Sequence, residues 1–485
     1  MSVNPYFTQY HTQRFSFIGS PLQRDGETGK DQRFVNLYPE LIKSPISDGK
    51  KYYLKKRPGV SLVNTIPGAS GQVQGFFYWS INQTYYTAIG GNLYAGNTFI
   101  TSLQTSTGQV GMCAYVSSNA ENLFVCDGVD AYVITPNNGL TVVTGVDGLP
   151  QPHIPTPVAL DGYIFLPSGI NTINNSNLNM PNSWPVDGFI DTELFSFQIV
   201  ALKRVQNYIA AITTGSIEWF YDNANATGSP LERNAPAVSQ FGCPAPYTID
   251  QTELELIMVG ETGNGGRTVW VINGFQPTEI GTEPVREALD NEGTSINLAN
   301  AYTIQVCGHK FYVLNLTGSS RTFVYDFEEQ MWHEWSGSTT LGVNYPWVYR
   351  YAADSGNGAP MLMAYTGAGQ LELSPNNYTD LGVPPLCFVQ TTKLDFDTIK
   401  RKRLYRLSVI CDGPNGDNNV PMTVNWSDDD YNTWVGNFTL NLNSSYPTVT
   451  QLGYTRRRAF QFVYQQPYPL RLEAFEVDII QEVRR

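Results

Sequence analysis

The sequence is poor in the residues that carry most metal and nucleophile chemistry. Its 485 residues include only four histidines and six cysteines. The histidines stand without a nucleophile or carboxylate at catalytic spacing, and no two cysteines form a CxxC pair. We therefore predict a protein that is not an enzyme, with no catalytic residues, no metal and no cofactor. The histidines are His11, His153, His309 and His333, and the cysteines, expected as buried free thiols, are Cys113, Cys126, Cys243, Cys307, Cys387 and Cys411.

Long apolar runs and a secretion signal are also missing. No window approaches the roughly 18 apolar residues of a membrane span, and residues 1–13 lack a charged start followed by an apolar core. We expect a soluble, unsecreted protein with no integral membrane segment. Charged residues make up only 15%, and 30 Lys and Arg against 43 Asp and Glu give a net charge of −13. The average surface therefore repels nucleic acid and anionic membranes.

Aromatic residues, glycine and proline are plentiful instead. The chain is 13% aromatic, with 43 Gly and 30 Pro, a composition typical of short strands separated by turns. Residues 310–335 show the pattern most clearly: a β-branched and aromatic run, a Gly and Ser turn, an alternating strand, a second turn and a third strand. Such a meander cannot bury its aromatic face alone, so it predicts stacked neighbours of the same kind.

The same succession of apolar strand, Gly-bearing turn and second strand recurs through residues 70–384. Successive repeats are 39 to 54 residues apart. Repeats of this length built from short strands are typical of propeller blades, and seven repeats predict about seven blades, with six or eight as alternatives. Another all-β arrangement is the competing hypothesis. The repeats are counted from Tyr85, Phe124, Ile164, Ile209, Ile257, Phe311 and Met363.

The chain divides into three predicted parts. Residues 1–65 are interpreted as an extended N-terminal arm, 66–384 as the β-propeller, and 385–485 as a β-sandwich domain of longer alternating strands after Pro384 and Pro385. A helix is predicted at residues 283–289, from a proline near its start, an acidic first turn and apolar positions at i, i+3 and i+4. We expect it to pack on the propeller rim, with a place in the core as the alternative.

Three basic stretches are candidates for partner contact. Residues 50–57 mix tyrosines with lysines, which fits a strand that binds nucleic acid or a protein partner, or an exposed edge strand protected from aggregation by lysine. Residues 400–403 and 456–458 lie beside strands of the last domain, where a solvated edge or an inter-subunit salt bridge is an equal alternative. The net charge favours protein partners over DNA. The candidate contact residues are Phe34, Tyr38, Tyr52, Tyr53, Lys55, Lys56, Arg57, Arg401, Arg403, Arg456 and Arg457.

The acidic cluster Asp428, Asp429 and Asp430 has two interpretations. It has the appearance of an acidic active site, but residues 427–434 resemble the Asp-box turn of sialidases and related β-repeat proteins. Ser427, Asp429, Thr433 and Trp434 match that motif, whereas Tyr431 stands where the motif has glycine. The resemblance implies a structural turn far from any catalysis.

Several patterns, taken in order, resemble the packaged-DNA stabilisation proteins of short-tailed bacteriophages. They are residues 33–40 (RFVNLYPE), residues 57–60 (RPGV), residues 215–220 (GSIEWF), the helix at 283–289, residues 324–335, and the C-terminal stretches 456–458 and 470–480. The resemblance covers most of the chain.

The resemblance implies a structural tail component, also called a tail accessory factor, hub or nozzle protein. It implies a ring of six copies below the portal and its adaptor, which prolongs the DNA channel, helps to retain the packaged genome and docks needle, fibre or spike proteins. DNA would pass without sequence-specific binding, and the protein would belong to the virion tail after assembly in the host cytoplasm. The alternative, from the Asp-box turn and the aromatic supply, is a carbohydrate- or receptor-binding, or glycan-degrading, tail propeller.

Overall fold

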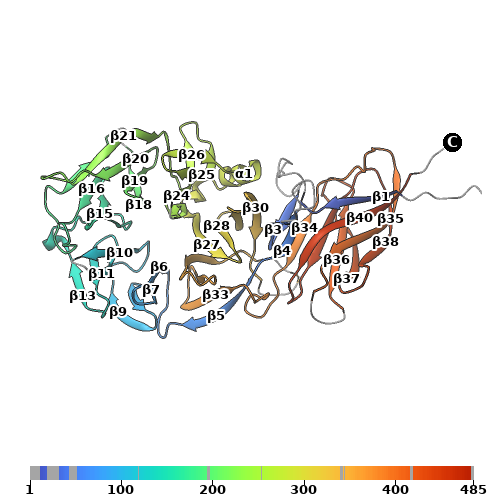
Figure 1. Ribbon diagram of the computed structural model, residues 1–485, viewed down its shortest axis with the longest axis horizontal. Helices are drawn as coiled ribbons and strands as arrows, with labels where there is room; N and C mark the ends of the chain where they lie inside the picture. Colours follow the sequence, from blue (N-terminus) through green and yellow to red (C-terminus); the bar gives the residue numbers. More distant parts are fainter. Residues whose placement is uncertain are drawn as a thin grey trace, which may run out of the picture. The chain divides into compact units, whose positions relative to one another are not determined.

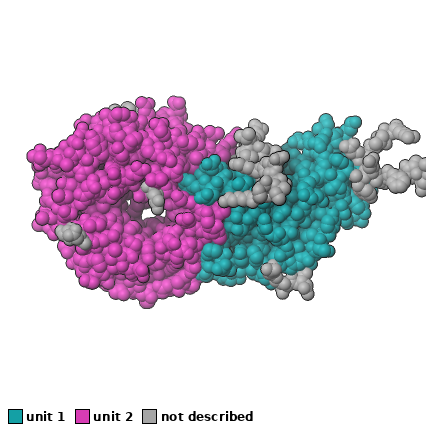
Figure 2. All heavy atoms as spheres, viewed as in Figure 1, with its two compact units in different colours: residues 1–61, 321–347, 374–485 teal, residues 62–320, 348–373 magenta. Residues whose placement is uncertain are grey.

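The computed structural model describes residues 11–18, 32–42, 52–117, 120–193, 197–252, 254–338, 342, 345–414 and 419–481. The chain forms two compact units that alternate along the sequence (Figure 2). Unit 1 contains residues 1–61, 321–347 and 374–485, and unit 2 contains residues 62–320 and 348–373. Almost every regular element is a strand, as the composition predicts.

Unit 2 is a succession of antiparallel sheets (Figure 1). The first four sheets contain β6 (Val73–Trp79) to β9 (Thr98–Ser102), β10 (Gly111–Ser117) to β13 (Leu140–Val143), β14 (Val158–Leu160) to β17 (Phe189–Asp191), and β18 (Ile199–Val205) to β21 (Leu231–Ser239). The strands between their ends are β7 (Thr84–Ile89), β8 (Asn92–Ala95), β11 (Ala120–Cys126), β12 (Ala131–Ile134), β15 (Tyr163–Ser168), β16 (Thr172–Asn175), β19 (Tyr208–Thr213) and β20 (Ile217–Asp222).

Three further sheets complete the series. The fifth is ordered β22 (Phe241–Gly242), β24 (Glu255–Thr262), β25 (Arg267–Asn273), β26 (Gln276–Glu279), with β23 (Asp250–Gln251) also paired to β24. The sixth is present in unit 2 as the hairpin of β27 (Asn300–Val306) and β28 (His309–Leu316). The seventh is β31 (Tyr349–Ala353), β32 (Met361–Ala364) and β33 (Gly369–Ser374), joined by β5 (Gly59–Thr65).

The sheets close into a ring. Neighbouring first strands contact each other in the first four sheets and again between β27 and β31. The fifth sheet contacts β18 through β24 and β27 through β23, and β31 of the seventh sheet contacts β6 of the first. At that closure the Val73 amide donates to the Tyr365 carbonyl at 2.9 Å, and the Ile66 amide donates to the Ala368 carbonyl at 3.0 Å. The described residues of unit 2 therefore form a β-propeller with a blade for each of the seven repeats, and the predicted fold class is confirmed.

Each predicted repeat begins in the second strand of its blade. Tyr85 lies in β7, Ile209 in β19 and Ile257 in β24, for example, and these strands contain runs of buried apolar residues. A second strand has a neighbour on both edges and a blade against each face, so both of its faces must be apolar. Because both faces are buried, these strands are continuous apolar runs, and the repeat can therefore be recognised in the sequence.

Apolar clusters join neighbouring blades. Trp79 and Leu93 of the first blade share a cluster with Leu123 and Tyr132 of the second, and all four are at most 2% exposed.

The hairpin turns between strands depend on residues that are adjacent in the sequence. Gly90 and Gly91, between β7 and β8, have φ of 56° and 80°, which only glycine adopts without strain.

One α-helix interrupts the described part of the propeller. The helix α1 (Glu283–Asn291) begins with Pro284 in its first turn and buries Val285, Ala288 and Leu289. It packs beside β25, where a guanidinium nitrogen of Arg267 donates to the Leu289 carbonyl at 3.4 Å. The predicted helix is confirmed, and it lies against the third strand of its blade. The 3₁₀ segments are η2 (Gly145–Asp147), η3 (Pro246–Thr248) and η4 (Gly293–Leu298), and no helix among the described residues meets the length and apolarity of a membrane span.

The described residues of unit 1 form two sheets. The first is ordered β3 (Leu37–Leu41), β4 (Tyr52–Lys56), β40 (Arg471–Gln481), β35 (Lys402–Cys411), β38 (Thr448–Thr455), with β1 (His11–Ser16) also paired to β40. The second is ordered β29 (Arg321–Asp326), β30 (Met331–Trp335), β2 (Arg33–Val35), β34 (Cys387–Gln390), β39 (Ala459–Tyr464), β36 (Pro421–Ser427), β37 (Val435–Asn441).

A single apolar core lies between these two sheets. Phe462 of β39 and Phe475 of β40 meet there with ring centroids 5.2 Å apart, and Phe17 packs on both. Strands β1 to β4 therefore share the sandwich with the C-terminal strands. Residues 1–10, 19–31 and 43–51 of the predicted arm lie outside the described residues. The domain limits at residues 65 and 384 stay a prediction.

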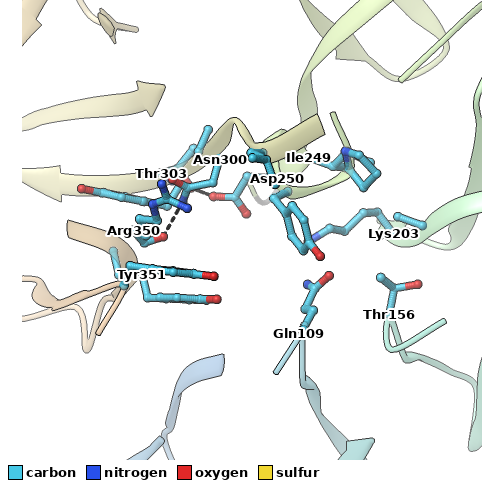
Figure 3. A pocket seen from close by; sticks show the side chains of 18 of the residues that line it. Gln109, Thr156, Lys203, Ile249, Asp250, Asn300, Thr303, Arg350 and Tyr351 are labelled. Atoms are coloured by element: carbon cyan, nitrogen blue, oxygen red, sulfur yellow. Dashed lines mark hydrogen bonds between the residues drawn. The ribbon is translucent and has the colours of Figure 1, made fainter. Parts of the chain in front are cut away.

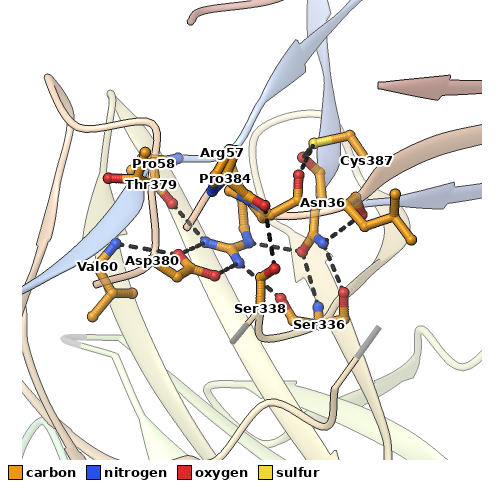
Figure 4. A network of polar contacts seen from close by, with 12 residues as sticks. Asn36, Arg57, Pro58, Val60, Ser336, Ser338, Thr379, Asp380, Pro384 and Cys387 are labelled. Atoms are coloured by element: carbon orange, nitrogen blue, oxygen red, sulfur yellow. Dashed lines mark hydrogen bonds and ion pairs between the residues drawn. The ribbon is translucent and has the colours of Figure 1, made fainter. Parts of the chain in front are cut away.

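A buried polar network holds the segments of unit 1 together (Figure 4). Arg57 is 0% exposed, and all five of its guanidinium N–H groups have acceptors. Two groups face the Asp380 carboxylate, at 2.5 and 3.0 Å, and the others donate to the Asn36 side-chain oxygen at 2.7 Å, the Pro58 carbonyl at 2.8 Å and the Ser336 carbonyl at 2.7 Å. A buried charge is tolerated only when it is paired and bonded in this way.

We expect Arg57→Leu to lower the free energy of unfolding by ~3–5 kcal/mol, because Asp380 would stay buried without its cation. Urea titration of the full chain measures the loss. Arg14→Leu is the matched control, because Arg14 forms an exposed ion pair with Glu476 and should cost at most ~1 kcal/mol. The double variant R57L/D380L should recover part of the loss. A loss for Arg57→Leu no larger than that of the control would contradict the interpretation.

Lys56, the residue before Arg57, is also buried. Its ammonium group donates to the Tyr378 carbonyl at 2.8 Å and to the Gln466 carbonyl at 2.6 Å. Burial lowers the pKa of Lys56 to about 8, with a smaller lowering from the Arg57 charge and opposing contributions from Cys387 and Asp380. Neither neutral carbonyl supplies a counter-charge, so the protonated form is disfavoured in the folded state.

Stability should therefore depend on pH through Lys56. Below about pH 8 this lysine is protonated in both the folded and the unfolded chain, so the cost of burying its charge is fully present. Between about 8 and the ordinary 10.5 the folded state releases the proton first, so that cost disappears as pH rises. From about pH 7 to about pH 10, the free energy of unfolding should rise by about 2–3 kcal/mol relative to Lys56→Met.

Parallel urea titrations of the wild type and Lys56→Met at several pH values test this expectation. Both proteins are made in a Cys387→Ala background, because burial raises the pKa of the Cys387 thiol and the Lys56 charge lowers it, so this thiol would titrate differently in the two proteins. Burial also raises the pKa of Tyr464, which is present in both proteins and cancels in the comparison. A difference between the two proteins that stays constant across this pH range would refute the assignment.

Candidate functional site

The two C-terminal basic stretches of the sequence meet in unit 1. Strands β35 and β38 pair so that Lys402 lies opposite Thr455 and Arg403 opposite Tyr454 (Figure 1). This register brings residues 400–403 beside residues 456–458. The term basic face is used below for the exposed members of the two stretches, which are Lys400, Arg401, Arg403, Arg456 and Arg457.

The two remaining basic residues point inward and hold the sheet. The Lys402 ammonium donates to the carbonyls of Asp395, Thr398 and Arg456 at 2.5 to 2.6 Å, and burial lowers its pKa. Arg458, 2% exposed, pairs with Asp428 at 2.6 Å. Within β35, the alternation of a strand places Lys402 and the exposed Arg403 on opposite sides.

The basic face carries charge without nearby compensation. Within the described residues, none of its five cations forms an ion pair. Arg401 lies over the exposed Tyr454 ring at 4.8 Å and Arg403 at 6.0 Å, contacts that orient both guanidinium groups. In a chain of net charge −13, this is a local positive surface that is suited to an acidic partner.

The N-terminal candidates have different environments. Tyr38, Lys56 and Arg57 are 0 to 3% exposed, so they have internal roles in the fold and offer no surface to a partner. Phe34, Tyr52, Tyr53 and Lys55 are half-buried. Of these, Lys55 pairs with Glu40 at 2.7 Å, and Tyr53 lies 3.9 Å beneath the Arg471 guanidinium. Partner contact by these four residues stays a prediction.

The alternative of an exposed edge strand is wrong for β4. Strand β4 pairs with β3 on one side and with β40 on the other, so its main-chain groups are satisfied on both edges. Its lysines therefore do not protect an open edge. Lys56 is instead enclosed by carbonyl groups, and Lys55 is part of a surface ion pair.

The acidic cluster at residues 428–430 has a structural partner for each carboxylate. Asp428 pairs with Arg458, and Asp430 pairs with Lys393. Asp429 accepts hydrogen bonds from the Thr433 amide at 2.9 Å and hydroxyl at 2.5 Å and from the Ser427 hydroxyl at 2.8 Å. These bonds, the Thr433 hydroxyl first, lower the pKa of Asp429 to about 2. The geometry agrees with the structural interpretation of the turn.

Tyr431 adopts the backbone conformation of the glycine that it replaces in this turn. Its φ is 64°, in the left-handed region. The Tyr431 amide donates to the Ser427 hydroxyl at 3.0 Å, and its phenol donates to the Thr391 carbonyl at 3.1 Å. These two contacts offset the strain of a non-glycine residue at this position.

Burial governs the chemistry of the cysteine thiols. All six cysteines are free, and burial raises the pKa of Cys113 and of Cys243 to about 12, so these thiols stay protonated. Across the described ranges, no group of three His, Cys, Asp or Glu side chains is placed to hold a metal ion.

Unit 2 contains a cavity that the sequence did not predict. Figure 2 shows the hollow in the middle of this unit, and the cavity measures about 410 Å³. Its polar lining includes Lys203 from β18, Asp250 from β23, Thr303 from β27 and Arg350 from β31 (Figure 3). No motif marks it, because these residues lie on different blades and are up to 147 positions apart in the sequence.

A comparison of the sequence with models of known protein families identifies the family of this chain. The model of a protein family described as bacteriophage P22 Gp10, β-propeller, matches residues 24–351, which is more than half of the chain. The chain belongs to this family. The P22 Gp10 family comprises packaged-DNA stabilisation proteins of short-tailed phages, so the resemblance noted in the sequence is confirmed and the chain has a structural role in a phage tail.

Other comparisons add little to this family assignment. Among curated proteins none matches the chain. Similar solved structures include the N-terminal domain of Nup159 (9% identity, TM-score 0.39, 70% of this chain and 98% of that chain) and YCF48 bound to D1 peptide (8%, 0.38, 66% and 100%). A further one is the extracellular domain of the putative hybrid two component system BT3049 from B. thetaiotaomicron (11%, 0.43, 65% and 42%). With TM-scores this low, none carries an argument about the P22 Gp10 family member described here.

Charge reversal on the basic face should remove binding to a polyanion. We expect the wild type to be retained on immobilised heparin at low ionic strength, and Arg403→Glu with Arg456→Glu to elute earlier because the local positive surface is lost. Arg14→Glu with Arg286→Glu makes the same change in net charge at two exposed, already paired arginines and should elute like the wild type. Equal shifts for both double variants would show that net charge alone decides retention.

Proposed function

We propose that this protein forms a ring of six copies in the phage tail, below the portal and its adaptor. The ring extends the DNA channel, helps to retain the packaged genome and docks needle, fibre or spike proteins. The observation that carries the proposal is the match of residues 24–351 to the P22 Gp10 family. The protein joins the virion tail after assembly in the cytoplasm of the host cell.

The charge distribution supports this role. A net charge of −13 disfavours adhesion of the chain to DNA, which suits a channel wall along which the genome must slide. Within that acidic average, the basic face offers an exposed set of cations with aromatic support. We assign the basic face to an acidic surface of a neighbouring tail protein, and contact by Phe34, Tyr52, Tyr53 and Lys55 belongs to the same proposal.

The ring predicts a definite mass for the assembled protein. Six chains of 54.0 kDa give about 324 kDa. Native mass spectrometry or light scattering of the purified full-length chain, alone and with the portal and adaptor, should show this species. A protein that stays monomeric in both conditions would overturn the proposed ring.

The docking surface is tested by co-purification with the portal and adaptor. Arg403→Glu with Arg456→Glu should weaken capture by at least tenfold, whereas the paired control Arg14→Glu with Arg286→Glu should not. Unchanged capture by the first variant would remove the basic face from the proposal while leaving the ring intact. The mass measurement and the capture measurement therefore test separate parts of the function.

A further inference from the structure

Two cations, Lys203 and Arg350, and one anion, Asp250, line the central cavity of unit 2, and the Asp250 carboxylate already has hydrogen-bond donors within the protein. Asp250 accepts hydrogen bonds from the Thr303 amide at 2.6 Å, the Thr303 hydroxyl at 2.7 Å and the Gln251 amide at 2.8 Å. Lys203 and Arg350 form no ion pair within the described residues. Figure 3 shows them on opposite sides of the cavity with Asp250 between them. The cavity therefore has an excess of positive charge.

The cavity also offers hydrogen-bond donors to a ligand. Among the described residues, the Arg350 guanidinium donates one side-chain hydrogen bond, to the Thr317 hydroxyl at 3.3 Å, and the Lys203 ammonium donates none. The Thr156 hydroxyl accepts from the Leu202 amide at 3.1 Å and still has its own proton to donate. A ligand that satisfies these groups must be rich in acceptors and carry negative charge.

Aromatic rings also line this cavity. Tyr247, Tyr351 and Tyr365 line the cavity, and the first and third are 41% and 40% exposed. Arg350 lies over the Tyr365 ring at 4.5 Å, which fixes its guanidinium. Burial, followed by the neighbouring Tyr247 and Tyr365, raises the pKa of Tyr351, so its hydroxyl stays protonated. Flat rings beside hydroxyl and charged groups fit a ligand with one apolar face and many polar atoms.

The size of the cavity suits a ligand of one or two rings. A volume of about 410 Å³ lies in the range of small-molecule sites, and it adjoins a second cavity of about 490 Å³ that shares Lys203, Asp250 and Tyr351. A longer ligand can therefore continue from the first cavity into the second. A pyranose ring has an apolar face for a tyrosine, and its hydroxyl groups suit Asp250 and Thr156.

We propose that this cavity binds a carboxylated sugar, of the uronic acid or sialic acid type. The carboxylate pairs with Lys203, the ring lies against the tyrosines, and the hydroxyl groups reach Asp250, Thr156 and, across the cavity, Arg350. The inference goes beyond the structural role proposed for the tail, since it assigns a small-molecule site to the propeller. It does not depend on the ring of six copies, and a monomeric chain would bind equally well.

Isothermal titration of the full-length chain with glucuronate and with N-acetylneuraminate tests the site. We expect saturable binding of at least one acid, and at least tenfold weaker binding of the neutral sugars glucose and N-acetylglucosamine. Inorganic phosphate is the third probe. Phosphate binding as tight as that of both acids would replace the sugar site by a simple anion site, and absence of binding by either acid would overturn the proposal.

Two cavity variants place the binding in this cavity. Lys203→Gln and Arg350→Gln should each weaken binding of the acid at least fivefold, and Lys203→Arg should retain most of it. Lys203 has no side-chain partner in the described residues, so Lys203→Gln should unfold at the same urea concentration as the wild type. Lys400→Gln makes the same charge change on the basic face and should bind normally. Equal weakening by Lys203→Gln and Lys400→Gln would overturn the assignment to this cavity.

Discussion

The buried Arg57 guanidinium is the interaction on which the organisation of unit 1 depends. Its five N–H groups connect the segment around residues 36–60 to Ser336 and Asp380, which lie 279 and 323 positions further along the chain. Trp347, whose ring lies 4.8 Å from the guanidinium, covers one face of it. A buried cation in this position requires its partners, so the network adds a polar constraint to the strand pairing of β2 with β30 and β34 that also joins these segments.

Unit 2 is organised by a different constraint, the need of each blade for neighbours. Second strands such as β19 and β24 are apolar on both faces because a blade lies on either side of them. The first strands instead face the middle of the unit, where no blade covers them. Lys203 and Arg350 lie on such strands and reach the central cavity. The polar lining of the cavity and the apolar blades thus arise from the same geometry.

Local sequence patterns predicted the elements that depend on local burial. The seven repeats, the helix at residues 283–289 and the bonded turn around Asp429 all follow from spacings within a few dozen residues. The basic residues were harder to interpret. Lys402 and Arg403 are adjacent in the sequence, yet the first is enclosed by carbonyl groups and the second is exposed, because neighbours in a strand point to opposite sides. The sequence alone identified the basic cluster, but it could not show which of its residues are buried and which are exposed.

The amino-acid sequence by itself determined that the chain is all-β, that its repeats form a propeller and that it belongs with the packaged-DNA stabilisation proteins, since these depend on periodicity and on ordered motifs. Tertiary structure alone decided that β1 to β4 join the C-terminal sandwich, that Lys56 and Arg57 are interior, and that Lys203, Asp250 and Arg350 share a cavity. Each of these outcomes depends on contacts between residues far apart in the chain, and no local pattern records which distant segment will supply a buried charge with its partner.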